Sequence, residues 1–338
     1  MKFLSDNTAP ATPEVLAALA AANLGPARAY GEDAWSERLD AAFGAYFGRE
    51  VRAFAVATGT AANALALATL VPVYGEILAA HGAHVLRDEC GACELQSGGA
   101  RVTGIAGVAG RLDAAALAGH LADHPVSVHS LQPAAVTITQ ATECGTVYTP
   151  AQIAALSAVC RARGLPLHMD GARFANALAH LSVTPAALTW QVGVDVLSFG
   201  ATKNGAFAAE AVVFFDTALV RDFELRRKRA AQLFSKMRYL SAQLLACIEG
   251  EFFAANARRA NRLAAQIAAA AGPRVLFPVE ANAVFLALRG GEARRLRAQG
   301  FEFYDWGPPQ RGAARFVVSW DQSEADVDAL CAALHACN

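Results

Sequence analysis

Short apolar runs and segments of helical period alternate through the first two-thirds of the chain. Uninterrupted apolar runs predict buried strands, and apolar residues that recur every three or four positions predict helices. We expect strands at Ala53–Ala57, Val126–His129, Ala134–Thr139, Leu165–Met169, Val194–Phe199 and Ala211–Phe215. We expect helices at Thr60–Val71, Asp113–Ala122, Pro150–Arg163 and Arg173–Ala179. Apolar strands that alternate with helices predict an α/β fold with a mostly parallel sheet covered on both faces.

The last third of the chain follows a different pattern. Thr217–Ala271 is nearly all of helical period and carries the basic run Arg226–Arg229. A smaller α/β unit follows, with strands expected at Ala283–Leu288 and Arg315–Ser319 and a closing helix from Ser323. A chain of 338 residues favours two domains. We therefore expect an N-terminal arm (1–14), a large domain (15–240) and a small C-terminal domain (241–338).

Composition and charge exclude several classes of protein. Hydrophobic residues make up 54% of the chain and charged residues 17%, which favours buried cores over disorder. A formal net charge of -1 gives no electrostatic reason to expect nucleic acid or an anionic membrane as partner. The start of the chain resembles no signal peptide, and the apolar runs are too short to span a membrane. Because the seven cysteines are widely spread, we expect no disulfide framework and a cytoplasmic protein.

A single lysine follows the predicted strand Val194–Phe199. Small and hydroxyl residues lead from that strand through Thr202 to Lys203, and Gly205 follows. Parallel-sheet enzymes place their sites at such carboxyl ends of strands. A lysine that forms a Schiff base needs partial burial and small neighbours that let a ring approach. The alternative is a solvated lysine after a strand.

A carboxylate ends another predicted strand, in the segment Leu167–Phe174. Asp170 is placed to face the ring nitrogen of pyridoxal 5′-phosphate (PLP), which must stay protonated to accept electrons. Arg173 is placed to reach the ring hydroxyl or a carboxylate. The alternative is that Asp170 caps the helix that follows.

A small-residue turn, Thr58-Gly59-Thr60, leads from the first predicted strand into a helix. Backbone N–H groups at such a helix start bind phosphate, and the threonine hydroxyls add donors. The turn lacks the further glycines of a dinucleotide-binding fingerprint. A strand, turn and helix without any ligand is the alternative.

Taken in this order, the three segments resemble fold-type I PLP enzymes and, more narrowly, the threonine aldolase family of the beta-eliminating lyase superfamily. Further segments carry the resemblance over nearly the whole chain: Phe3–Thr8, Ala29–Asp33, Ala83–Val85, Asp88–Gly91 and Arg315–Ser319. The resemblance implies an aspartate aminotransferase-like large domain and a lyase that cleaves threonine and related β-hydroxy-α-amino acids to glycine and an aldehyde.

The resemblance also implies roles for individual residues. Lys203 would be the Schiff-base lysine, Asp170 the partner of the pyridine nitrogen, and His84 the residue that stacks on the ring and lies near the substrate hydroxyl. Thr58, Gly59, Thr60, Thr202 and Arg173 would contact the cofactor. Ser5, Arg173 and Arg315 would contact the substrate carboxylate, and Tyr30 would line the pocket from the adjoining subunit of a homodimer or homotetramer. A basic residue among Arg226–Arg229 would reach the phosphate across the interface, while the alternative for most of this run is a solvated helix face.

Other functions stay open at this point. β-Elimination or transamination would use the same lysine and aspartate, and a PLP-binding protein without turnover is a different class. A nicotinamide-dependent oxidoreductase is disfavoured by the missing glycine fingerprint. Cys90 and Cys93 have the spacing of half a zinc site, but no second pair accompanies them, so we expect no metal. The dispersed histidines His81, His120, His124 and His129 could be ligands in principle, but we interpret them as surface or core residues.

Overall fold

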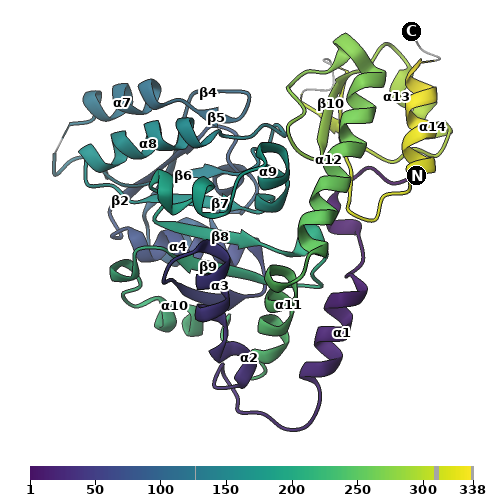
Figure 1. Ribbon diagram of the computed structural model, residues 1–338. Helices are drawn as coiled ribbons and strands as arrows, with labels where there is room; N and C mark the ends of the chain where they lie inside the picture. Colours follow the sequence, from purple (N-terminus) through teal and green to yellow (C-terminus); the bar gives the residue numbers. More distant parts are fainter. Residues whose placement is uncertain (126, 308–311, 336–338) are drawn as a thin grey trace.

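The computed structural model describes residues 1–125, 127–307 and 312–335. Its large unit is built on a seven-stranded sheet in the order β1-β9-β8-β7-β6-β2-β3 (Figure 1). The strands are β1 (Arg52–Val56), β2 (Gly75–Ala80), β3 (Arg101–Ile105), β6 (Gln132–Thr139), β7 (Leu167–Gly171), β8 (Val196–Gly200) and β9 (Glu210–Phe214). Only β9 runs against its two neighbours, and the other adjacent pairs are parallel. The predicted mostly parallel sheet is confirmed.

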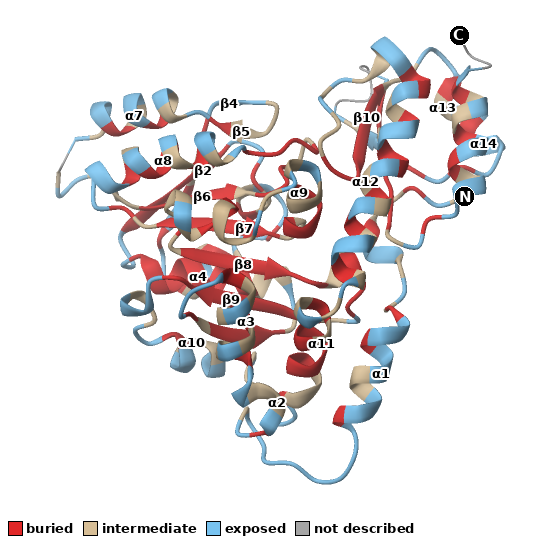
Figure 2. Cartoon of the chain, in the orientation of Figure 1, coloured by how far each residue is buried: buried red, intermediate tan, exposed pale blue. Residues whose placement is uncertain are grey.

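Helices cover both faces of this sheet because side chains alternate between two apolar cores. One core joins the sheet to α3 (Leu39–Phe47), α7 (Ala114–Asp123), α8 (Pro150–Ala162), α9 (Phe174–Leu181) and α11 (Arg238–Glu249). The other joins it to α4 (Gly59–Leu70), α6 (Ala92–Ser97) and α10 (Phe223–Arg229). Figure 2 shows the consequence: β2, β7, β8 and β9 are buried at every residue, whereas the outer helices expose one side.

A smaller unit follows at the carboxyl end. Its three-stranded antiparallel sheet has the order β10 (Ala283–Ala287), β12 (Ala313–Val317), β11 (Tyr304–Trp306). It packs with α12 (Phe252–Ala271), α13 (Glu292–Ala298) and α14 (Glu324–His335) around a separate apolar cluster. The start of the chain joins this unit, because Lys2 pairs with Glu302 and Phe3 lies in the same cluster. The expected domain limits at residues 14 and 240 stay a prediction.

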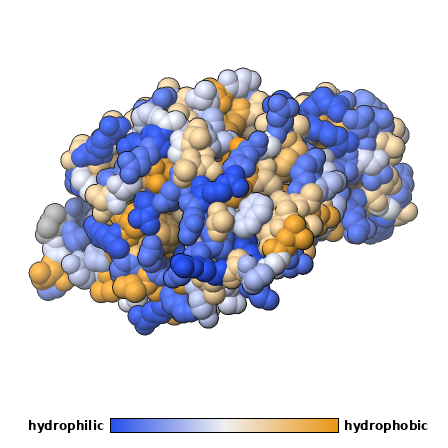
Figure 3. Space-filling model, turned by 60° about the horizontal axis from the view of Figure 1, so that its bottom comes forward, coloured by the Kyte–Doolittle hydropathy of each residue, from blue (hydrophilic) through white to orange (hydrophobic). Residues whose placement is uncertain are grey.

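Short elements complete the chain. α1 (Pro13–Ala22) packs against α11, and α2 (Ala34–Glu37) precedes α3. α5 (His84–Arg87) follows β2, and β4 (Gly107–Val108) pairs with β5 (Arg111–Leu112). None of the helices in the described part of the chain is long and apolar enough to cross a membrane. Polar and apolar residues intermingle on the face shown in Figure 3.

All four predicted helices of the first two-thirds exist, as α4, α7, α8 and α9. Thr149 caps α8, and Pro150 is its first residue, as expected. The strand expected at Val126–His129 is wrong over its described residues: 127–129 form a loop and turn in which Val128 is 97% exposed, and Val126 lies outside the described part. β2 and β3 had no predicted counterpart, because a charge and a glycine interrupt each apolar run. In the sheet those charges lie near the strand starts, and apolar side chains of the two strands pack into the cores on both faces.

Gly200, at the carboxyl end of β8, offers a test of the close packing beneath the site. A Cβ at this position would lie 2.6 Å from the Ala172 Cα and 2.7 Å from its carbonyl oxygen. Since backbone cannot move aside easily, we expect Gly200→Ala to destabilise the protein by about 1–3 kcal/mol.

Gly119 in α7 provides the matched control, because a Cβ there meets nothing within 4 Å. Gly119→Ala is expected to stabilise the helix by about 0.5–1 kcal/mol. Urea denaturation followed by circular dichroism measures both changes. Equal unfolding free energies for the two variants would contradict the packing described here.

Candidate active site

The carboxyl ends of the parallel strands meet at one edge of the large sheet, and a cavity of about 370 Å³ lies there. It brings together the following predicted site residues: Thr58, Gly59, Thr60, His84, Asp170, Arg173, Thr202 and Lys203. A second cavity of about 670 Å³ adjoins it toward the small unit and shares His84, Arg173 and Lys203 with it. Ser5 and Arg315 line this second cavity. Segments far apart in the sequence thus converge on Lys203.

The amino end of α4 forms one wall of the first cavity. Thr58 caps this helix by accepting a hydrogen bond from the Ala61 N–H at 3.1 Å. No described residue accepts a hydrogen bond from the backbone N–H of Gly59 or Thr60. A Cβ at Gly59 would meet nothing within 4 Å, so open space lies in front of these donors. Free N–H groups and the positive end of the helix dipole make this an anion-binding site.

Asp170 lies at the end of β7 and is 4% exposed. Its Oδ1 accepts from the Ala172 N–H at 3.0 Å, and its Oδ2 accepts from the Asn63 side-chain amide at 2.8 Å. The carboxylate is thereby fixed in the cavity, and each oxygen keeps a lone pair for a further donor. The helix-cap alternative fails, because α9 starts at Phe174 with no side-chain capping bond.

Asn63 joins Asp170 to a second buried carboxylate. The same amide donates its other hydrogen to Glu89 Oε1 at 2.8 Å. His84 Nδ1 also lies 2.8 Å from Glu89 Oε1, and because a carboxylate only accepts, Nδ1 carries the hydrogen. The hydrogen bond to Glu89 raises the pKa of His84, while burial raises the pKa of Glu89. In the neutral ring, Nε2 of His84 is therefore left with its lone pair.

Lys203 sits in the one-turn 3-10 helix Thr202–Asn204 after β8 and is half-buried. Its Nζ forms no hydrogen bond with any described residue. Nearby, Glu210 is buried, accepts from the Ala201 N–H at 2.9 Å, and has its pKa raised by burial to about 7. Thr202 bonds locally to the backbone of Ala209. The backbone of Lys203 is thus fixed by the short helix, and its unpaired side chain lines the cavity.

Arg173 forms an ion pair with Asp6, which the sequence did not suggest. Its Nε and Nη2 donate to the two oxygens of Asp6 at 2.7 and 2.9 Å. Burial would raise the pKa of Asp6, but Arg173, assisted by Lys203 and Asn282, outweighs it and lowers that pKa. The contact expected between Arg173 and the cofactor or substrate is thereby limited to the donors that Asp6 leaves free, chiefly Nη1.

Arg315 lines the second cavity from β12. One amine hydrogen bonds to the Leu4 carbonyl at 3.4 Å, and the guanidinium lies 5.3 Å from the centre of the Tyr304 ring. Its Nε is buried without any hydrogen-bond partner among the described residues, and burial lowers its pKa. A partly buried guanidinium with an unused donor is suited to a carboxylate ligand. The Ser5 hydroxyl, which accepts from the Asn7 N–H at 3.2 Å, lines the same cavity.

Tyr30 is the one predicted site residue that lies away from both cavities within the chain. Its ring is 51% exposed, and the Lys228 amine lies 4.4 Å above it. It lines a different hollow, formed with residues of β1 and the start of α11. In the basic run, Arg226 pairs with Asp222, and Arg227 lies over Phe54. Within a single chain, neither Tyr30 nor this run reaches Lys203, so their expected roles depend on a partner subunit.

The sequence reasoning missed five polar residues of the site: Asp6, Asn63, Glu89, Glu143 and Glu210. Asp6 and Glu89 lay inside segments that carried the family resemblance, and this was the available signal. Glu143 lines both cavities, accepts from the His84 N–H at 2.7 Å, and has its pKa raised by burial to about 7. Its Oε2 is buried without a hydrogen bond in the described structure. It is a further titratable group beside His84.

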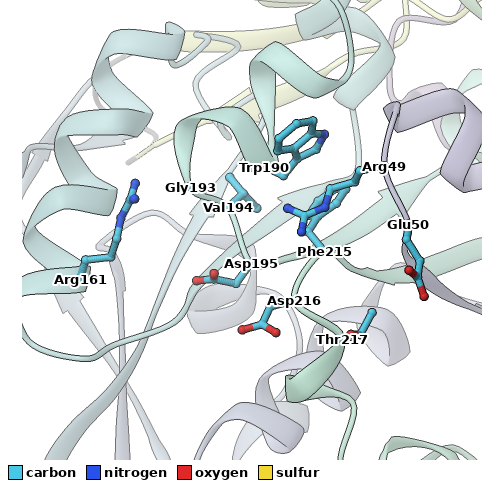
Figure 4. Close-up of a pocket in the computed structure, with 10 residues that line it drawn as sticks. All are labelled: Arg49, Glu50, Arg161, Trp190, Gly193, Val194, Asp195, Phe215, Asp216 and Thr217. Carbon is cyan, nitrogen blue, oxygen red and sulfur yellow. The ribbon is translucent and has the colours of Figure 1, made fainter.

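Another cavity, of about 390 Å³, lies at the opposite, amino-terminal end of β8 (Figure 4). Its polar groups serve the fold. Asp195 accepts from the Leu167 N–H at 2.7 Å, and Arg161 donates to Ser157. Arg49 stacks over the Trp190 ring at 4.9 Å. We assign no chemistry to this cavity.

A mostly parallel sheet with a buried carboxylate and an unpaired lysine at its carboxyl edge, beside a helix start with free N–H groups, defines a fold-type I enzyme of the PLP-dependent class. Comparisons with known proteins bear this out. The family model described as beta-eliminating lyase matches residues 2–290, so the chain belongs to the beta-eliminating lyase family, whose enzymes depend on PLP.

Individual relatives narrow the comparison. The chain is 43% identical to a low specificity L-threonine aldolase of Pseudomonas sp. (strain NCIMB 10558), covering 99% of this chain and 97% of that protein. It is 44% identical to a protein of the same description from Pseudomonas aeruginosa, covering 95% and 93%. The solved threonine aldolase of Leishmania major superposes with a TM-score of 0.93 at 26% identity, covering 99% of both chains.

The residues present fit PLP. The open space before Gly59 and Thr60 suits a phosphate, and the fixed carboxylate of Asp170 suits a protonated ring nitrogen. The unpaired amine of Lys203 lines the same cavity. The structure thus supplies an anion cradle, a carboxylate and an amine in one place.

Asn63 is expected to hold the buried carboxylates of Glu89 and Asp170 in place. Asn63→Leu preserves the side-chain shape but removes a hydrogen bond from each carboxylate, so we expect a loss of about 2–4 kcal/mol of unfolding free energy. Thr69→Val is the control in the same helix, because it removes only a bond to the Leu65 carbonyl, worth about 0.5–1.5 kcal/mol. Chemical denaturation measures both. A loss in Asn63→Leu no larger than in Thr69→Val would show that the amide does not support the carboxylates.

Proposed function

We propose that this protein is a PLP-dependent aldehyde-lyase of threonine aldolase type. It cleaves the Cα–Cβ bond of L-threonine, L-allo-threonine and related β-hydroxy-α-amino acids such as phenylserine, giving glycine and an aldehyde. The observation that carries the proposal is the convergence of Lys203, Asp170 and His84 on one cavity. The two Pseudomonas relatives, described as low specificity L-threonine aldolases, support the same substrate class.

We assign the cofactor contacts as follows. The amine of Lys203 would hold the cofactor aldehyde. The backbone N–H groups of Gly59 and Thr60 would bind its phosphate, with Thr58 and Thr202 shaping the wall. Asp170 would pair with the protonated pyridine nitrogen, and His84 would contact the ring. When bound, PLP supplies the electron sink for the pair released by bond cleavage.

The chain's own residues decide which bond breaks. Arg315 and Ser5 bind the substrate carboxylate, assisted by the free donors of Arg173. A carboxylate fixed on that side would orient the substrate so that its Cα–Cβ bond is the one placed for cleavage. This orientation favours cleavage of the Cα–Cβ bond over loss of the Cα hydrogen.

His84 is the base that removes the β-hydroxyl proton, either directly or through a water it positions. Its Nδ1–H is held by Glu89, so Nε2 is the atom that accepts the proton. Glu143, bonded to the His84 backbone and lining both cavities, is placed to accept or return a proton near neutral pH. Both groups serve the general acid–base steps of cleavage and of reprotonation to glycine.

An assembly of two or four identical subunits completes the proposal. The exposed Tyr30 and the basic run from Arg226 to Arg229 lie outside the cavities of their own chain, and an adjoining subunit would bring them to a neighbour's cavity. We also propose a cytoplasmic location, which suits the reduced thiols of the described cysteines.

Product analysis tests the proposed reaction. With PLP and L-threonine, the wild-type protein is expected to form acetaldehyde and glycine in equal amounts, and Lys203→Ala is expected to form neither, because it lacks the amine that holds and releases the cofactor. Lys236→Ala is the control, since that exposed lysine lines neither cavity.

Other products would identify a different reaction. Pyruvate or another 2-oxo acid with ammonia would indicate β-elimination, and a 2-oxo acid with pyridoxamine phosphate would indicate transamination. A protein that absorbs visible light with PLP but converts none of several β-hydroxy amino acids would be a PLP-binding protein without turnover. Each of these results would contradict the aldolase proposal.

The pH profile tests the role of Glu89. His84 can accept a proton only when neutral, so kcat/KM is expected to fall as pH drops through its raised pKa. Glu89→Gln removes the charged partner that raises this pKa, and the acid limb is expected to move to lower pH. Glu50→Gln, which changes an exposed carboxylate away from the site, is expected to leave the limb in place. If the limb does not move in Glu89→Gln, His84 is not the base.

A further inference from the structure

Three potential metal ligands meet away from the cofactor cavity. Glu76 lies near the amino end of β2, His120 in the last turn of α7, and His124 directly after that helix. One ligand atom from each lies within 4.8 Å of the others. His84 follows the opposite, carboxyl end of β2, so this cluster is on the far edge of the sheet from Lys203. Two of the four histidines that the sequence analysis interpreted as surface or core residues are therefore brought together with a carboxylate.

The His124 ring is held in one tautomer. Its Nε2 lies 2.6 Å from the Leu131 carbonyl oxygen, and because a carbonyl only accepts, Nε2 carries the hydrogen. In the neutral ring, Nδ1 then presents a lone pair, and it lies 3.5 Å from Glu76 Oε2. Two electron-rich atoms that face each other at this distance need a positive charge between them. Metal-binding histidines are commonly oriented by such a carbonyl bond on the second ring nitrogen.

The other two ligand atoms are buried and unused. Glu76 is 6% exposed; its Oε1 accepts from the Thr103 hydroxyl, but its Oε2 forms no hydrogen bond with any described residue. His120 Nε2 is likewise buried without a partner in the described structure. His120 and His124 are one helical turn apart, which places both rings on the same side, with centroids 5.7 Å apart. Unpaired buried polar atoms of this kind are costly unless a ligand satisfies them.

We propose that Glu76, His120 and His124 bind one Zn²⁺ ion. Two imidazole nitrogens and one carboxylate oxygen form a common zinc ligand set, with water in the fourth position. Imidazole ligands favour zinc over Ca²⁺ and Mg²⁺, which prefer oxygen. Zinc bonds of about 2.0–2.2 Å require the three atoms to approach somewhat closer than they are. Small rotations of the two half-buried histidines provide this movement.

The ion would act as a clamp within the fold. It joins α7 and the segment after it to the start of β2, and the Thr103 hydroxyl on β3 orients the carboxylate. Otherwise α7 is held mainly by the apolar contacts of Leu117 and Leu121. A second cluster, formed by His84, Glu89 and Asp170, has similar spacing, but it belongs to the cofactor site.

Metal analysis of the PLP-loaded enzyme tests the proposal. The enzyme is freed of metal with a chelator, dialysed against ZnCl₂ and analysed for bound zinc. We expect one more zinc per chain in the wild type than in His120→Ala or Glu76→Gln. His129→Ala, which removes an exposed histidine just beyond the cluster, is expected to bind as the wild type does. The difference in zinc content between wild type and variant excludes any zinc that cysteines bind, because both proteins contain the same cysteines.

Thermal unfolding supplies a second readout. Zinc is expected to raise the Tm of the wild type and of His129→Ala by about 2–4 °C, and to leave His120→Ala and Glu76→Gln unchanged. Alanine favours the helix at position 120, and an unchanged PLP absorbance confirms that each variant is folded. Equal zinc content in wild type and His120→Ala, or no zinc in the wild type, would overturn the proposal. It would indicate instead that a protonated His124 bridges Glu76 and the Leu131 carbonyl. Either result leaves the aldolase proposal untouched.

Discussion

The site depends on the way one side-chain amide holds two buried carboxylates. Asn63 sits one turn inside α4 and donates to Glu89 and to Asp170. Through Glu89 the same amide is linked to His84. The helix that supplies the free N–H groups at Gly59 and Thr60 therefore also fixes the acidic partner and orients the base. A single element, packed against β8 and β9, sets the positions of an anion cradle, a carboxylate and an imidazole.

The cavity gathers more acidic than basic groups. Glu89, Glu143, Asp170 and Glu210 line it, whereas Arg173 and Lys203 are the cationic side chains and Arg173 is already paired with Asp6. Burial raises the pKa of Glu143 and of Glu210 to about 7, so both lie near the point of protonation at neutral pH. Such an environment favours a positive charge on a bound ring. It also gives the site proton donors and acceptors that operate near neutral pH.

Much of the fold could be predicted from the sequence because its signals were local. The helix α8 begins with a threonine cap and a proline, and β8 is a mostly apolar segment that ends shortly before Lys203. β2 and β3 could not be predicted in this way, since their burial comes from helices contributed elsewhere in the chain. Val128 was wrongly predicted to lie in a strand. Its apolar neighbours favour a strand only where a helix or another strand buries them, and Val128 is exposed.

The site was predictable where strand ends carry distinctive residues, as at Asp170 and Lys203. It was not predictable where a role arises from contacts between distant segments. Asn63 appears in the sequence as one polar residue in an apolar helix, and the pairing of Arg173 with Asp6 joins residues 167 positions apart in the chain. The role expected of Tyr30 would require a partner subunit, because Tyr30 lines neither cavity of its own chain.

The proposed chemistry requires the amine of Lys203 to hold the cofactor opposite Asp170. The chain has four lysines, Lys2, Lys203, Lys228 and Lys236, so the attachment point can be distinguished cleanly. Borohydride reduction of the PLP-loaded protein, followed by peptide mapping, measures it directly. We expect one pyridoxyl label per chain, on the peptide containing Lys203. A label on another lysine, or none, would contradict it.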